Sequence, residues 1–283
     1  MTTKLNDFVF ESAFEGDDII TQDKYMKSCL KYPELMEYAK IDCLYQSCPE
    51  WRGYNYVDYK IKKPITVFAH SDHRLTDSLI QQYNQPFIKH IFSTNADCFD
   101  PRAEGIPHGL TEDCHDTVDH PITGNKDILY DVLRSKKKLK YNCYMNFRVK
   151  TNYNVRALTW NTLVEKPFIY KRLTEDHNIN LTDRKQFLQD IYDSAFTVCP
   201  RGNGIDTVRL WESLYCRTIP IVKRELAMRY FQDLPILWID DWNEIESVSW
   251  LNKQYERIMD SQWNLDKLKI PYWEQRFLVA ANS

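Results

Sequence analysis

The segment that most constrains the fold is 196–215, in which a short apolar run leads through two glycines into an amphipathic stretch. Residues 195–199 predict a buried strand, because the run is short and rich in β-forming residues. Residues 205–216 predict a helix whose apolar positions should pack on a sheet: Val208, Trp211, Leu214 and Tyr215. A strand, a glycine loop and a helix in succession are typical of a parallel α/β sheet.

The same alternation extends through both halves of the chain. In the first half we expect strands at 64–69 and 90–94 with a helix at 75–83 between them, and 105–109 closing this unit. We also expect one or two helices over 25–39, broken at Pro33, and another at 127–133. In the second half the expected strands are 140–147, 195–199, 218–222 and 236–239. The expected helices there are 154–163, 183–194, 205–216, 242–258 and 271–281.

A basic stretch at 134–140 separates the two halves and is the expected domain junction. A length of 283 residues suits two domains, for which we expect the bounds 1–138 and 139–283. We allow for the last helix to pack back on the first domain. The lysines at 136–138 are more typical of a solvated linker than of a nucleic-acid patch.

Charge and composition exclude several classes of protein. The 37 basic and 40 acidic residues give a net charge of −3, which argues against a general nucleic-acid binder. The first residues do not form a signal peptide, and no apolar run is long enough to anchor the chain in a membrane. We therefore expect a cytoplasmic protein with free thiols.

A metal site is not expected from the spacing of the possible ligands. The eight cysteines are scattered without a CxxC pair, which disfavours structural zinc. The loop 114–120 mixes Cys, His and Asp, and such a loop is more often solvated than metal-binding. Asp240 and Asp241 lack the DxD spacing of metal-dependent transferases, and we interpret them as a strand end.

Glycine is scarce, so its positions are informative: the chain has seven, where about 20 would be usual. Gly202 and Gly204 flank Asn203 in the loop after the predicted strand, where they allow positive φ and close approach of a ligand. Asp206 is placed to cap the following helix. The helix N-terminus favours a phosphate, which Arg201 could also reach from the loop.

Arg209 and Glu212 lie on one stripe of this helix with Asp206, at spacings of three residues. Arg209 could hold a diphosphate, and an acid on this stripe could accept the two hydroxyls of a ribose. The alternative is an ordinary α/β crossover whose Arg and Glu form a surface pair.

The run 199–215 (CPRGNGIDTVRLWESLY), followed by 218–222 (TIPIV), resembles the exostosin-like glycosyltransferases, glycosyltransferase family 47. Weaker similarity extends to 145–152 with Arg156, and to 67–73 and 105–109. The resemblance implies a GT-B fold, with two Rossmann-like domains facing across a cleft. It also implies a UDP-sugar donor, an oligosaccharide or glycoprotein acceptor, inversion at the anomeric carbon, and no essential metal or other cofactor.

Residue by residue, the resemblance implies that Arg201 and Arg209 bind the diphosphate and that Glu212 binds the ribose. Arg156 and Arg148 are further phosphate candidates. The chain is shorter than the animal and plant members, and we expect it to be without their membrane anchor. In this it is similar to the chlorovirus exostosin-like enzymes that glycosylate capsid protein. This similarity implies transfer of xylose from UDP-xylose.

An inverting transfer needs a general base for the acceptor hydroxyl. Such a base is expected at the carboxyl end of a strand in the first half, where Asp72 is the first candidate and His70 and His73 are alternates. Asp72 could instead cap the helix that begins near Leu75.

Two other functions stay open at this stage. The chain could be a sugar-nucleotide-binding module that lacks catalysis, or a GT-B transferase that uses a GDP-sugar, similar to a fucosyltransferase.

Overall fold

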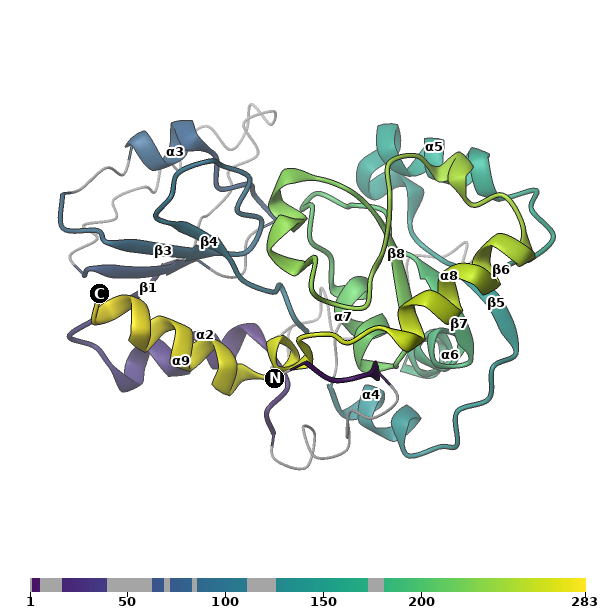
Figure 1. The fold of residues 1–283 in the computed structure, drawn as a ribbon, viewed down its shortest axis with the longest axis horizontal. Coiled ribbons are helices and arrows are strands. Elements are labelled where there is room, and N and C mark those ends of the chain that lie inside the picture. The colour runs from purple at the N-terminus through teal and green to yellow at the C-terminus, as the bar shows by residue number, and fades with distance from the viewer. Residues whose placement is uncertain are drawn as a thin grey trace.

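The computed structural model describes residues 2–5, 17–39, 63–68, 72–82, 86–110, 126–172 and 181–283. These residues form an α/β protein with two parallel sheets, one in each half of the chain (Figure 1). We refer to them as the N-terminal sheet and the C-terminal sheet.

The N-terminal sheet has the strand order β1-β2-β3-β4. Its strands are β1 (Met36–Ala39), β2 (Ile65–Phe68), β3 (His90–Ser93) and β4 (Ala103–Gly105). Neighbouring strands are parallel, so their carboxyl ends lie along one edge. The helix α3 (Asp77–Gln82) lies on one side of this sheet, and α2 (Gln22–Lys31) and α9 (Ile270–Ala281) lie together on the other (Figure 1).

The strand β1 corrects the sequence prediction, which expected helix on both sides of Pro33. The helix α2 ends at Lys31, and Met36–Ala39 pairs with β2, with Met36 opposite Ile65. Leu, Met, Glu and Ala favour helix locally, but pairing with a neighbouring strand overrides this weak preference.

The C-terminal sheet has the strand order β6-β5-β7-β8-β9. Its strands are β5 (Tyr141–Met145), β6 (Ile169–Lys171), β7 (Ser194–Val198), β8 (Ile219–Lys223) and β9 (Leu237–Ile239). Its longer helices are α5 (Tyr153–Leu163), α6 (Leu181–Tyr192), α7 (Val208–Tyr215) and α8 (Val248–Asp260). Because β6 lies on one side of β5 and β7 on the other, the order of the strands reverses between β5 and β7.

Short 3-10 helices fill several connections: η3 (Val149–Asn152), η4 (Leu226–Phe231), η5 (Trp242–Glu244) and η6 (Leu265–Leu268). The predicted continuous helix over 242–258 is therefore wrong. Asp241 forms a capping box with Glu244 at η5, and Ser247 then caps α8 by accepting the Trp250 N–H at 3.1 Å. Two N-cap signals close together begin two separate helices.

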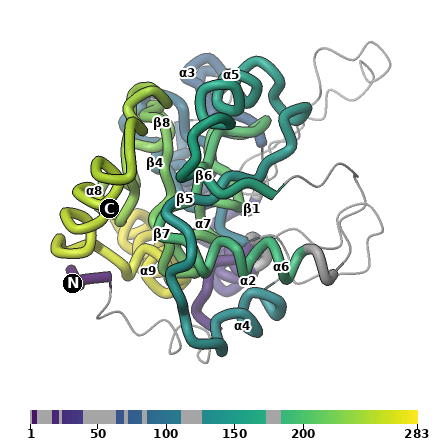
Figure 2. The backbone as a smooth tube through the Cα atoms, turned by 90° about the vertical axis from the view of Figure 1, so that its right-hand side faces the viewer, coloured from purple at the N-terminus to yellow at the C-terminus, as the bar shows by residue number. Residues whose placement is uncertain are grey.

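The helix α4 (Lys126–Leu133) belongs with the C-terminal sheet, although the division at residue 138 assigns it to the first half. It packs beside α6, as Figure 2 shows. Lys137, expected in a solvated linker, is half-buried and donates to the carbonyls of Cys216 and Arg217, each at 2.8 Å. It thus satisfies two carbonyls just beyond the C-terminal end of α7, which cannot bond within the helix.

A large apolar cluster joins the two halves, because α9 returns to the N-terminal sheet. Phe277 of α9 meets Phe92 of β3 edge to face, with ring centroids 4.6 Å apart. Tyr215 of α7 donates to the Leu268 carbonyl and accepts from the Ile20 N–H. Within the described ranges, no helix has both the length and the apolar character needed to cross a bilayer.

Candidate functional site

The candidate site lies at the carboxyl edge of the C-terminal sheet, where the strand order reverses. In open α/β sheets, ligands bind outside the carboxyl ends of the strands at such a reversal. The loop that leaves β7 carries Gly202 and Gly204, and the loop that leaves β5 carries Arg148 and Asn152. The fold therefore brings the glycine loop next to the segment that carries Arg148, a further phosphate candidate.

Two hydrogen bonds to backbone carbonyls stabilise the glycine loop, one from within the loop and one from Asn152. Gly202 N–H donates to the Gly204 carbonyl at 3.0 Å, and Asn152 Nδ2 donates to the Gly202 carbonyl at 2.8 Å. Neither glycine has the expected positive φ. They are needed for space instead: a Cβ at Gly202 would lie 2.9 Å from Arg156 Nη2.

Arg156 supports this loop rather than projecting into solvent. It is 6% exposed and donates through Nε to the Arg201 carbonyl and through Nη1 to the Arg148 carbonyl, both at 2.9 Å. Burial, and next the nearby Arg209 charge, lower its pKa to about 9. Arg156 thus ties the two loops together, while the Arg148 side chain itself is exposed.

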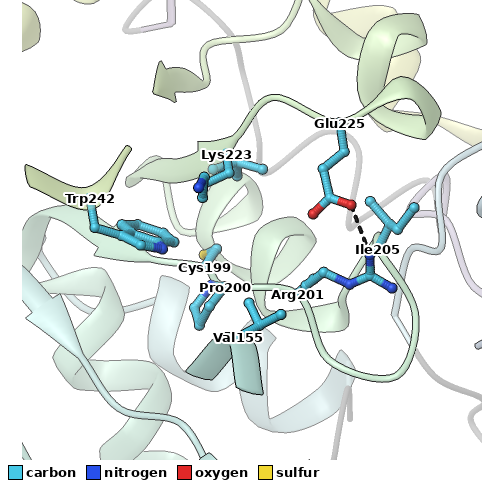
Figure 3. Close-up of a pocket in the computed structure, with 9 residues that line it drawn as sticks. Val155, Cys199, Pro200, Arg201, Ile205, Lys223, Glu225 and Trp242 are labelled. Carbon is cyan, nitrogen blue, oxygen red and sulfur yellow. Dashed lines mark hydrogen bonds and ion pairs between the residues drawn. The ribbon is translucent and has the colours of Figure 1, made fainter. Parts of the chain in front are cut away.

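Arg201 borders a hollow that Figure 3 shows at close range. Its Nη1 pairs with Glu225 Oε2 at 2.9 Å, and Lys223 at the end of β8 lines the same hollow. Burial raises the pKa of the Glu225 carboxyl, and the Arg201 charge opposes this shift. Trp242 closes the side of the hollow away from this pair (Figure 3). The hollow therefore combines an aromatic wall with a carboxylate and an ammonium group.

Glu212 is not exposed as a surface pair would require. It is 2% exposed and forms an ion pair with Arg184 of α6, which is 6% exposed. Sequence reasoning missed Arg184, because nothing in the local pattern of α6 marks it. The predicted ribose acceptor is thus already neutralised by a buried cation.

Arg209, one helical turn before Glu212, is in a different position. The residue as a whole is half-buried, and its guanidinium carbon lies 5.8 Å from the centroid of the Phe187 ring. Its Nε is buried without a hydrogen-bond partner, and no described carboxylate pairs with it. Burial lowers its pKa, because removal from water disfavours the charged form.

Asp206 is not the N-cap that its position predicted. Thr207 occupies the N-cap of α7 without a side-chain cap bond. The Asp206 carboxylate is 2% exposed and accepts the backbone N–H of His108 at 2.7 Å and Trp211 Nε1–H at 2.8 Å. It therefore faces the N-terminal sheet and its own helix, not the solvent.

The loop after β2 reaches the glycine loop from the opposite side. Asp72 is exposed, and its Oδ2 accepts from Asn203 Nδ2 at 3.5 Å. The first turn of α3 is capped by Thr76, whose hydroxyl accepts the Leu79 N–H at 3.3 Å, so Asp72 is not needed as a cap. His73 is half-buried, and burial lowers its pKa. His70 lies outside the described residues.

Two further residues were not singled out from sequence. His108 is 7% exposed, and burial lowers its pKa, while the nearby Asp72 charge opposes this shift. Asn95 is 3% exposed, and it accepts the Asp206 N–H through its side chain and the Leu75 N–H through its carbonyl. The only local signals are that Asn95 follows the predicted strand at 90–94 and that His108 lies in the segment 105–109.

In the part of the chain that the structure describes, no group of three His, Cys, Asp or Glu side chains could hold a metal ion. The loop 114–120 lies outside that part.

A scan against models of known protein families and a search of curated proteins each gave no match. The function is therefore inferred from the residues and their geometry.

Proposed function

We propose that this chain is a metal-independent, inverting glycosyltransferase that uses a UDP-sugar, with UDP-xylose as the first donor to test. On this proposal the two sheets belong to the two Rossmann-like domains of a GT-B fold, and the donor lies at the carboxyl edge of the C-terminal sheet. The acceptor is a glycan hydroxyl presented from the side of the N-terminal sheet.

The observation that carries the proposal is the uncompensated guanidinium of Arg209. It lies in the first turn of α7, half-buried, with its Nε unpartnered among the described residues. A buried charge without a counter-ion is costly, so a site of this kind is stabilised by an anionic ligand. The N-terminus of α7 adds its own preference for an anion. A diphosphate matches both features.

Asp72 supplies the second half of the proposed chemistry. The acceptor oxygen attacks the anomeric carbon, its proton passes to the Asp72 carboxylate, and the bond from the anomeric carbon to UDP breaks. The negative charge that develops on UDP is stabilised by Arg209 and the α7 N-terminus. The contact between Asp72 and Asn203 supports this role, because it brings the base candidate to the glycine loop.

The test measures UDP affinity by calorimetry and UDP release with UDP-sugars and a glycan acceptor, in the presence of a metal chelator. Arg209→Met should weaken UDP binding about 10- to 150-fold, since a hydrogen bond to a charged group is worth about 1.5–3 kcal/mol. Arg257→Met is the matched control, because Arg257 is an exposed arginine on α8. Asp72→Asn should stop transfer and leave UDP affinity unchanged.

Each contrary outcome has a definite meaning. Equal UDP affinity in Arg209→Met and Arg257→Met would refute the diphosphate assignment. UDP binding without release from any donor would indicate a non-catalytic binding module, and tighter binding of GDP would indicate a GDP-sugar enzyme. Loss of transfer on chelation would contradict metal independence, and normal turnover in Asp72→Asn would remove Asp72 as the base.

A further inference from the structure

Asp206, just after the glycine loop, links three separate parts of the chain. Its carboxylate accepts from the His108 N–H, just beyond β4, and from Trp211 Nε1–H, within α7. Its own N–H donates to Asn95 Oδ1 at 2.7 Å, just beyond β3. The bonds therefore run from the C-terminal sheet unit to two strand ends of the N-terminal sheet.

Asn95 carries the connection onward to the loop of Asp72. It has a φ of 56°, a left-handed conformation that asparagine tolerates better than most residues. In this conformation its carbonyl accepts the Leu75 N–H at 3.0 Å, while its side chain accepts from Asp206. One residue thus holds both the segment that follows Asp72 and the end of the glycine loop.

The glycine loop packs directly on this connection. A Cβ at Gly204 would lie 3.0 Å from Asn95 Nδ2 and 3.1 Å from the Asp206 carbonyl oxygen. Asp206 and Asn95 are 2% and 3% exposed, and both carboxylate oxygens of Asp206 already accept N–H donors. The Asp206 carboxylate is therefore not available to bind a sugar nucleotide.

We propose that Asn95 and Asp206 form a joint, here called the inter-sheet joint, that fixes the separation between the Asp72 loop and the glycine loop. Asp206 is then a positioning residue and not a donor-binding residue. This inference rests on the proposed function for its catalytic consequence, but the joint itself is a property of the fold. A displacement of about 1 Å between reacting groups can lower turnover about 100-fold, so the joint should control kcat.

Two variants perturb the joint from opposite sides. Asp206→Asn keeps the side-chain volume but places an amide N–H₂ against an N–H donor, which breaks one of the two bonds. Asn95→Gly removes the acceptor and keeps the left-handed backbone and its carbonyl bond to Leu75. Ser247→Ala is the control, because it removes a cap of α8 outside the joint.

The experiment combines hydrogen exchange with kinetics. Both joint variants should exchange the amides of 105–110 and 202–208 at least tenfold faster than the wild type, with no change in β8 and β9. Their kcat should fall tenfold or more, while UDP affinity stays within twofold. Ser247→Ala should change neither exchange in these segments nor kcat.

Three outcomes would overturn the inference. Unchanged exchange at 105–110 and 202–208 would show that there is no joint. A loss of UDP affinity in proportion to kcat would show that Asp206 acts on the donor directly, and normal kcat with faster exchange would show that the joint does not position the site. If the wild type itself neither binds UDP nor releases it, the proposed function fails, while the exchange measurement still decides the joint.

Discussion

The buried ion pair between Arg184 and Glu212 gives the sharpest prediction about stability. The two side chains are 6% and 2% exposed and come from neighbouring helices, α6 and α7. Replacing one partner leaves the other charge buried without compensation, which costs about 3–5 kcal/mol. For a chain of this size that loss corresponds to a fall in Tm of about 6–20 °C.

The two single replacements should differ in a definite direction. Burial lowers the pKa of Arg184, and the nearby charge of Arg209 lowers it further. Glu212→Leu therefore leaves two guanidinium groups without a carboxylate, whereas Arg184→Met leaves Glu212 with Arg209 one helical turn away. We expect Glu212→Leu to lose more stability than Arg184→Met. The double variant should lose less than either single variant, because apolar side chains can replace a buried pair at little cost.

The assay is urea unfolding of the wild type, both single variants and the double variant, analysed as a double-mutant cycle. A coupling energy of about 3 kcal/mol or more is expected. Additive losses, or single losses below about 1 kcal/mol, would refute the reasoning that this pair is buried and mutually compensating. Such a result would also make Glu212 a candidate for binding the ribose again, because its carboxylate would then not be paired with Arg184.

Two further predictions concern the contact between the sheets. Gly105→Ala should lower the free energy of unfolding by about 1–3 kcal/mol in urea, because the new Cβ would lie 2.3 Å from Cδ2 of Tyr230, and an unchanged midpoint would contradict this packing. Burial raises the pKa of the Asp206 carboxyl to about 7, so the folded chain keeps a proton that the unfolded chain releases near pH 4. The stability that this carboxyl contributes should be present below about pH 4 and should be lost as the pH rises to about 7. Between about pH 5 and about pH 8, the free energy of unfolding of the wild type should therefore fall more than that of Asp206→Asn. An equal change in the two proteins would show that the pKa of Asp206 is not raised.

Most strands could be predicted because their signals are local. The runs at 64–69, 90–94 and 195–199 are short and apolar between polar segments, and the structure has β2, β3 and β7 there. The α/β class followed from the same alternation. By contrast, β1 could not be predicted, because its residues favour helix and only its pairing with β2 makes it a strand.

The glycine loop of the candidate site could be predicted from the sequence, but the contacts of its residues could not. Local spacing showed that a glycine loop enters a helix after a strand, and the structure has this loop at the reversal of the C-terminal sheet. The partners that decide each residue's role are distant in sequence. His108 lies 98 residues from Asp206, and Glu225 lies 24 residues from Arg201. Nothing in the local pattern identifies such contacts.

The stripe of Asp206, Arg209 and Glu212 shows why this distinction matters for function. Spacings of three residues predict one shared face and hence one shared ligand. In the structure Asp206 precedes the helix and bonds to the N-terminal sheet, and Glu212 pairs with Arg184, so only Arg209 keeps a charge without a described partner. Two members of the stripe therefore make contacts that stabilise the fold, and the third is the residue that binds an anion on the proposed function. Charge removal at Arg209 should then act on ligand affinity, whereas removal at Asp206 or Glu212 should act first on geometry or stability.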